Sequence, residues 1–137
     1  MHTEQPKIFL VEDNPVYQTL ILKQLESISQ DIQVFSKGEN CLSELSSSAV
    51  LPDLVILDYH LEGVINGYDI LKHLKKMPSP PPVIFFSSNL ELTITSSILK
   101  LGIVEYIEKT IFSLSRLKES TNGVLKNFPG SVPVADR

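Results

Sequence analysis

Apolar residues fall into two patterns that alternate along the chain. Short continuous apolar runs are typical of buried strands, and they occur at residues 7–11, 32–35, 54–57, 83–86 and 104–107. Segments in which apolar residues recur every three or four positions predict amphipathic helices. Five such segments are expected: an apolar stripe from Tyr17 to Ile28, a helix over 38–45, one that ends near Met77, one around 94–101, and one over 114–128. The pattern therefore predicts five strands that alternate with five helices.

Individual residues mark where these elements begin and end. Asn14 suits the N-cap of the first helix and Pro15 suits its first turn. Prolines at position 78 and at 80–82 force an extended connection after the third helix. The fourth helix contains several Thr and Ser residues of low helix propensity, which also suits a segment that shifts between two states.

Strands that are apolar throughout need cover on both faces, which predicts an α/β fold with a doubly wound parallel sheet between helices. Residues 1–128 are expected to form this single domain, with 129–137 as a short, disordered C-terminal tail. Ligands of such folds bind beyond the carboxyl ends of the strands. That edge of the sheet is therefore where functional side chains are expected.

Composition narrows the class of protein. A length of 137 residues fits one domain, and a formal net charge of −4 argues against a broad basic face for nucleic acid. The single cysteine, Cys41, excludes a disulfide framework and is expected to be a packing residue. No apolar run approaches the length of a membrane span and the first residues do not resemble a signal peptide, so a cytoplasmic location is expected.

Polar residues follow four of the five strands. Glu12 and Asp13 follow the first, Asp58 the third, Ser87 the fourth and Lys109 the fifth. Neighbouring strands lie about 4.8 Å apart, so these side chains are expected to meet. Three carboxylates at that range repel one another, which a hard divalent cation such as Mg²⁺ relieves. A carboxylate can also act as a nucleophile toward phosphorus and form an aspartyl-phosphate.

Each residue taken singly has a simpler interpretation. The acidic pair can cap the next helix, Asp58 can be a turn residue, and Ser87 can cap the fourth helix. Lys109 can be a solvated surface charge. The convergence of all five on one edge of the sheet favours a functional site.

Four segments carry a family resemblance: IFLVEDNP at 8–15, PDLVILD at 52–58, VIFFSS at 83–88 and LGIVEYIEK at 101–109. Over residues 6–128 the sequence resembles a receiver domain of bacterial two-component response regulators. The resemblance implies a flavodoxin-like sheet with strand order 2-1-3-4-5. It also implies a phosphorelay protein that accepts a phosphoryl group and is not an enzyme in its own right.

The resemblance assigns a role to each site residue. Asp58 is expected to take the phosphoryl group from a phosphohistidine of a sensor histidine kinase or a histidine phosphotransfer protein. Asp13 is expected to bind Mg²⁺ directly and Glu12 through water, with Asp58 and the backbone carbonyl of His60 completing the protein ligands. The imidazole of His60 could flank the phosphoryl group, but the preferred interpretation is an exposed loop side chain.

The remaining assignments concern the response to phosphorylation. Ser87 and Lys109 are expected to contact phosphoryl oxygens, and Tyr106 matches the aromatic position that turns inward when the hydroxyl residue moves. Tyr106 can also be an ordinary core residue. The face of the fourth helix, fifth strand and fifth helix is expected to bind a downstream protein, in a monomer or weak dimer without direct nucleic-acid or membrane contacts.

Three positions depart from the family pattern. Thr110 stands where proline commonly follows the lysine, and a trans peptide is expected there because a cis bond before a non-proline residue costs about 3–4 kcal/mol. The loop YHLEGVING has Leu61 and Glu62 in place of a Met-Pro pair and one extra residue before Gly67. Ser87 replaces the commoner threonine and keeps the hydroxyl.

Two other functions remain as alternatives. A receiver-like interaction module that is not phosphorylated would fit the departures at Thr110 and in the loop. A Mg²⁺-dependent phosphatase of the haloacid-dehalogenase type would need a second aspartate two residues after the nucleophile, where His60 stands.

Overall fold

The protein is described from a computed structural model, which places residues 4–128. Five parallel strands form one sheet in the order β2-β1-β3-β4-β5, which confirms the predicted fold and strand order. The strands are β1 (Ile8–Val11), β2 (Ile32–Phe35), β3 (Leu54–Leu57), β4 (Val83–Ser87) and β5 (Glu105–Glu108). The helices are α1 (Pro15–Leu25), α2 (Gly38–Ser47), α3 (Gly67–Lys75), α4 (Leu92–Leu101) and α5 (Leu114–Leu125), with a short 3-10 turn at Ile111–Ser113 before α5.

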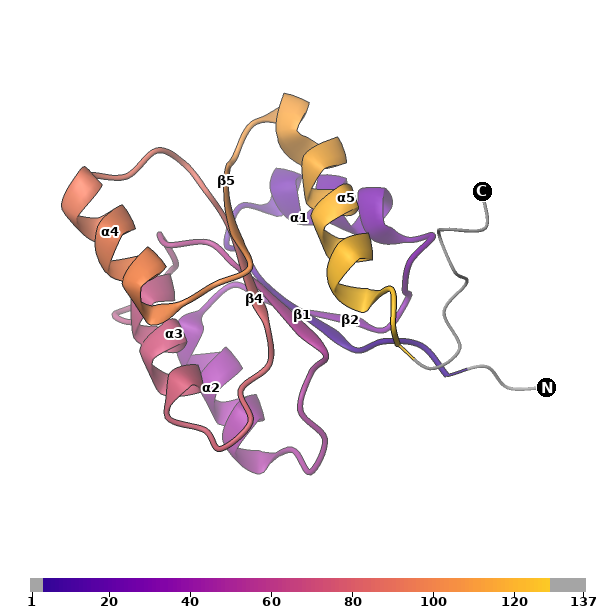
Figure 1. Cartoon of the computed structure of the whole chain (residues 1–137), viewed down its shortest axis with the longest axis horizontal. Coiled ribbons are helices and arrows are strands. Elements are labelled where there is room, and N and C mark those ends of the chain that lie inside the picture. Colours follow the sequence, from indigo (N-terminus) through magenta and orange to yellow (C-terminus); the bar gives the residue numbers. More distant parts are fainter. Residues whose placement is uncertain (1–3, 129–137) are drawn as a thin grey trace.

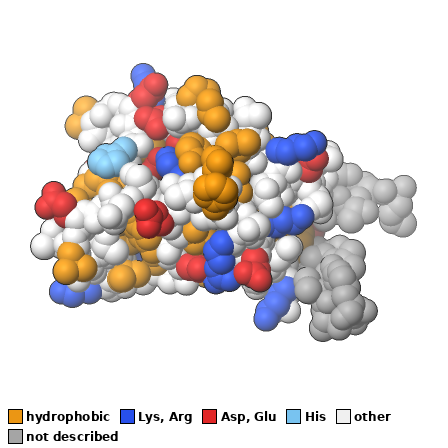
Figure 2. Space-filling view, turned by 90° about the horizontal axis from the view of Figure 1, so that it is seen from above, with side chains coloured by type: hydrophobic (Ala, Val, Ile, Leu, Met, Phe, Trp, Pro, Cys, Tyr) orange, Lys and Arg blue, Asp and Glu red, His pale blue; other side chains and the backbone are white. Residues whose placement is uncertain are grey.

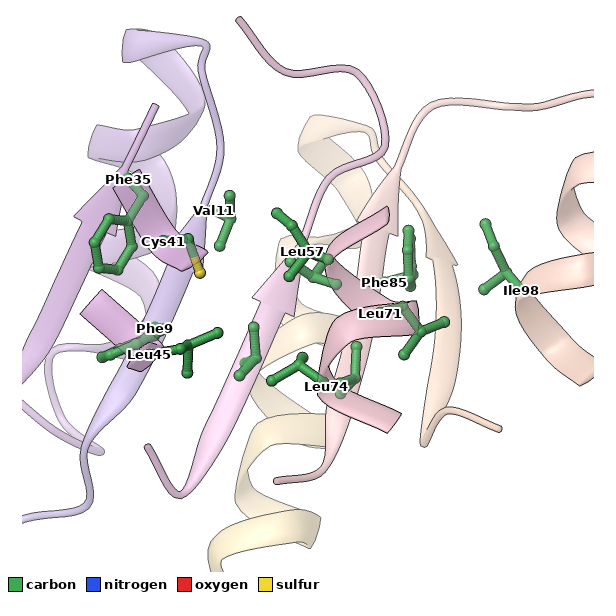
Figure 3. Packing of buried hydrophobic residues seen from close by; sticks show 13 residues of the cluster. Phe9, Val11, Phe35, Cys41, Leu45, Leu57, Leu71, Leu74, Phe85 and Ile98 are labelled. Carbon is green, nitrogen blue, oxygen red and sulfur yellow. The ribbon is translucent and has the colours of Figure 1, made fainter. Parts of the chain in front are cut away.

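The helices form two layers around the sheet. Helices α1 and α5 cover one face, and α2, α3 and α4 cover the other (Figure 1). Successive strand residues point to opposite faces, so each buried strand supplies both cores. Phe9 and Phe85 pack toward α2, α3 and α4 (Figure 3), and Val55 belongs to the same cluster. Ile56 and Phe86 pack toward α1 and α5. Because helices cover both faces of the sheet, β1 and β3 are apolar throughout and appear in the sequence as continuous apolar runs.

The lone cysteine belongs to the core under α2. Cys41 is fully buried beside Phe35 and Val11, and burial raises the pKa of its thiol to about 12. Its predicted packing role is therefore confirmed.

The element ends differ slightly from those predicted. Strand β5 begins one residue later than expected, at Glu105, because its pairing with β4 starts at Ile84 and leaves Val104 half-exposed. Helix α1 ends at Leu25, so Ile28 packs against the core from beyond the helix. The expected tail at 129–137 lies outside the described residues.

Helix α4 is held less firmly than its neighbour α3. It buries only Ile98, whereas α3 buries four residues and begins with a capping box between Asn66 and Asp69. No side chain caps the beginning of α4. Within residues 4–128, no helix combines the length and the apolar character needed to span a membrane.

Candidate functional site

The carboxyl ends of β1, β3, β4 and β5 bring the predicted site residues together. Backbone hydrogen bonds continue the sheet past the strand ends: the Asp58 amide donates to the Val11 carbonyl at 3.0 Å, and the Lys109 amide donates to the Ser87 carbonyl at 2.8 Å. The Glu12 amide likewise donates to Phe35 at 2.9 Å. The site residues therefore start from backbone positions that the sheet itself fixes.

Asp58 occupies the centre of the site and is 3% exposed. Its Oδ1 accepts a hydrogen bond from the Ser87 hydroxyl at 2.7 Å, and its Oδ2 forms an ion pair with Lys109 Nζ. The Ser87 oxygen in turn accepts a hydrogen bond from the Tyr59 amide at 3.2 Å. Each oxygen of the Asp58 carboxylate thus has a polar partner of its own.

Lys109 joins the two buried carboxylates. Its Nζ lies 3.0 and 3.1 Å from the two carboxylate oxygens of Glu12, and the lysine side chain is only 12% exposed. Burial would lower the pKa of Lys109, but its hydrogen bond to Asp58 and the charges of Asp58 and Glu12 outweigh burial and raise it. Lys109 is therefore fully charged at neutral pH.

Glu12 is the least exposed carboxylate of the site. Burial, followed by the charge of Asp58, raises its pKa to about 7, although Lys109 and the Asn14 amide act in the opposite direction. That amide donates to Glu12 Oε2 at 3.1 Å. The pKa of Glu12 is raised because burial and the charge of Asp58 together outweigh the opposing effects of Lys109 and the Asn14 amide.

Three carboxylates form a group suited to a hard cation. Glu12, Asp13 and Asp58 each offer an oxygen that lies within 4.8 Å of the others. Oxygen ligands and an excess of negative charge are what Mg²⁺ requires, so the residues fit the predicted metal. The imidazole of His60 is exposed and lies perpendicular to the Tyr59 ring, with 5.0 Å between ring centres. The metal role of the His60 carbonyl stays a prediction.

The loop from β3 to α3 closes tightly on the backbone of Asp58. A Cβ atom added to Gly67 would lie 2.2 Å from the Asp58 carbonyl oxygen, so only glycine allows this approach. The Gly67 amide donates to Tyr59 at 2.9 Å, and farther along the loop the Val64 amide donates to the Glu39 carboxylate of α2 at 3.1 Å. Contacts to other elements therefore hold the loop that carries the extra residue.

The loop from β5 to α5 is closed by its own side chains. The described residues contain no cis peptide bond, so the bond before Thr110 is trans, as predicted. The Thr110 hydroxyl accepts from the Phe112 amide at 3.2 Å, and the Thr110 amide donates to the Ser113 hydroxyl at 3.0 Å. Ser113 also donates to the Glu108 carbonyl at 2.7 Å. These bonds fix the chain directly after Lys109 without a proline.

Tyr106 lies at the edge of the site and is half-buried. Its ring is stacked on Phe85 with 6.1 Å between centres, and its hydroxyl donates to the Ser88 carbonyl at 2.7 Å. Partial burial is the main cause that raises the pKa of the Tyr106 hydroxyl. The tyrosine thus contacts the residue next to Ser87, which leaves both the core and the switch interpretations available.

One site residue was missed from the sequence. The ring of Tyr17 in α1 has Lys109 Nζ 4.9 Å from its centre, although the sequence placed Tyr17 only on an apolar helix face. An aromatic residue in the first helical turn after an acidic pair is the one available signal, because it lies close to any cation that pairs with those acids.

Apolar side chains surround the site on the molecular surface. Figure 2 shows hydrophobic side chains in the middle of one face, beside a small group of acidic and basic side chains. Five strongly exposed hydrophobic residues lie on the loops and helix ends at the carboxyl edge of the sheet: Val16, Val64, Leu92, Ile111 and Phe112.

Comparison with known proteins gives a consistent result. A family model described as the response regulator receiver domain matches residues 8–122. The chain is 36% identical over 103 residues to the transcriptional regulatory protein CssR of Bacillus subtilis, covering 74% of this chain and 44% of that protein. It is 26% identical over 112 residues to the peroxide stress-activated histidine kinase mak3 of Schizosaccharomyces pombe, covering 75% of this chain and 5% of the kinase.

A solved structure extends the likeness to three dimensions. The phosphorylated cyanobacterial phytochrome response regulator RcpA superimposes with a TM-score of 0.75 at 26% identity, over 90% of this chain and 93% of that one. The chain spans half or less of the curated relatives named above. The activities of those longer proteins are therefore not transferred with the fold.

Proposed function

The chain belongs to the response regulator receiver domain family, and from that premise we propose that Asp58 accepts a phosphoryl group from a phosphohistidine. The donor is a sensor histidine kinase or a histidine phosphotransfer protein. An oxygen of Asp58 bonds to phosphorus while the phosphorus–nitrogen bond of the donor breaks, and the electron pair of that bond stays on the imidazole nitrogen.

The environment of the Asp58 carboxylate carries this proposal. Ser87 Oγ and Lys109 Nζ each contact a different oxygen of this carboxylate, so a hydroxyl and an ammonium already lie beside the group that would be phosphorylated. Phosphoryl transfer depends mainly on positioning and on neutralising charge at the phosphoryl oxygens. Lys109 would provide such charge, and Ser87 would provide a hydrogen bond.

The acidic group supports a role for Mg²⁺. Asp13 and Asp58 would bind the ion directly, Glu12 through water, and the His60 carbonyl would complete the protein ligands. The bound ion would supply positive charge for the phosphoryl oxygens. Glu12 supports this assignment because burial, followed by the charge of Asp58, raises its pKa to about 7, and a bound cation would stabilise the ionised carboxylate.

The weakly packed side of the domain would transmit the signal. Phosphorylation would draw Ser87 toward the phosphoryl group and change the contacts of Tyr106, which would shift the face formed by α4, β5 and α5. A single buried residue in α4 supports a low cost for such a shift. The output would be contact with another protein by a monomer or weak dimer, not with nucleic acid.

The test is the intact mass of the protein after incubation with acetyl phosphate, with and without Mg²⁺. Wild type is expected to gain one phosphoryl group only with Mg²⁺, and Asp58→Asn is expected to gain none. A retained adduct in Asp58→Asn would place the acceptor elsewhere. No adduct, together with no binding of beryllium fluoride, would favour the alternative of an interaction module that is not phosphorylated.

A further inference from the structure

An aromatic ring lies beside the Lys109 ammonium in addition to the two carboxylates. The centre of the Tyr17 ring lies 4.9 Å from Lys109 Nζ, within the range of a cation–π interaction. The same ammonium pairs with Glu12 and Asp58. Because the lysine side chain is only 12% exposed, little water screens these contacts. The ring thus adds to the interactions that hold the charged group of Lys109.

One contact fixes the backbone of Tyr17 within α1, and another holds its ring against the sheet. Its backbone amide donates to the Asn14 side chain at 3.1 Å in the N-cap of α1. Its ring meets Phe86 of β4 edge-on, with 6.2 Å between centres and 70° between planes. Moving the ring away from Lys109 would therefore disturb its contact with Phe86 in the core beneath it.

We propose that Tyr17 is a positioning residue that holds the Lys109 ammonium at the acceptor carboxylate through its aromatic face. This role rests on the proposed function, because Lys109 must be charged and correctly placed to meet the incoming phosphoryl group. Once Asp58 carries that group, the ammonium exchanges a carboxylate oxygen for a phosphoryl oxygen. The ring contact does not involve Asp58, so it persists through the exchange.

The contact is tested first without any phosphorylation. Protons above an aromatic ring resonate upfield, so the Lys109 side-chain protons next to Nζ are measured by NMR. The upfield shift is expected in wild type and in Tyr17→Phe and is expected to disappear in Tyr17→Leu. Equal shifts in wild type and Tyr17→Leu would overturn the proposal.

The positioning role is tested by the rate of phosphorylation with acetyl phosphate and Mg²⁺. A partly desolvated cation–π contact corresponds to a loss of about 3- to 30-fold in Tyr17→Leu, with Tyr17→Phe close to wild type. In a Lys109→Ala background, Tyr17→Leu should cause no further loss, because the ring then has no ammonium to hold. An equal further loss in that background would mean a merely structural role and would overturn the proposal.

A matched pair provides the control. Lys72 Nζ lies 4.9 Å from the Tyr68 ring centre on α3, but neither residue contacts a site carboxylate. Tyr68→Leu is therefore expected to leave the phosphorylation rate unchanged.

If wild type shows the NMR shift but no phosphorylation, the proposed function fails and the positioning role fails with it, while the ring contact stands. If wild type is phosphorylated and Tyr17→Leu matches it, only the role of Tyr17 fails.

Discussion

The two loops beside Asp58 both depart from the usual family sequence, and they are stabilised in opposite ways. The β3–α3 loop is tied to another element, because its Val64 amide donates to Glu39 of α2, and its two ends approach closely at Gly67 and Asp58. The β5–α5 loop is held from within, by hydrogen bonds that join Thr110 and Ser113 to residues at most five positions away.

The difference reflects what each loop contributes to the site. The first loop contributes backbone close to the acceptor, so its path must be fixed relative to the rest of the fold. The second contributes the charge of Lys109, which requires only that the chain be stiff directly after the lysine. A loop with non-local contacts should therefore be costly to disturb, and a loop with local contacts should tolerate changes better.

Gly67→Ala should give the largest effect and tests whether the β3–α3 loop is costly to disturb. A methyl group 2.2 Å from the Asp58 carbonyl forces the backbone apart, and we expect a loss of about 3 kcal/mol in the free energy of unfolding. Urea denaturation measures this loss. The control is Gly123→Ala in α5, where nothing lies within 4 Å and the same change should stabilise the protein by about 0.5–1 kcal/mol. An unchanged urea midpoint for Gly67→Ala would show that the loop adapts.

The second prediction concerns the pH dependence of stability. Glu12 follows strand β1 and pairs with Lys109, the first residue of the β5–α5 loop. The pKa of Glu12 is about 7 in the folded protein and about 4.5 when unfolded. Between these values the folded state binds more protons, so rising pH should lower the free energy of unfolding by up to about 3 kcal/mol.

Urea unfolding in metal-free buffer from pH 4.5 to pH 7 measures this fall. Glu12→Gln removes the titrating group, so its curve should lack the part of the slope that Glu12 causes. The same slope in both proteins would mean that ionising the Glu12 carboxylate does not lower the free energy of unfolding.

The smallest effect is expected in the second loop. Thr110→Ala removes the hydroxyl that accepts from the Phe112 amide, a cap of the kind that is worth about 1 kcal/mol. Thr110→Ser keeps the hydroxyl and should restore most of the stability in a thermal or urea titration. A loss as large as that of Gly67→Ala, or a serine variant no better than alanine, would remove the distinction between the two loops.

Much of the fold could be predicted from the sequence because strands and helix ends depend on residues that are close together in the chain. Continuous apolar runs located the strands to within a residue, and Asn14 and Pro15 marked the beginning of α1 correctly. The residues after the strands were grouped correctly as well, since parallel strands all end at one edge of the sheet. Glu12 and Asp58 are neighbours in space for that reason alone.

The parts that were missed depend on contacts between distant segments. Nothing near Glu39 in the sequence indicates that its carboxylate accepts from the Val64 amide, 25 positions away. The sequence marks Gly67 only as the end of the YHLEGVING loop and does not show that a side chain there would collide with the Asp58 carbonyl. Tyr17 fits the apolar stripe of α1 equally well with or without Lys109 beside it. The spacing of apolar residues predicts which face of a helix is buried, but it does not identify the residues that pack against that face.

The burial of Cys41 has a practical consequence for studying this domain. A thiol with a pKa of about 12 carries almost no thiolate at neutral pH, so it should react slowly with maleimides and methanethiosulfonates. A second cysteine placed on exposed helix α4 would then be the preferred target for a fluorophore or spin label. The native sequence thus already provides an almost unreactive background for spectroscopic measurements of how α4 moves.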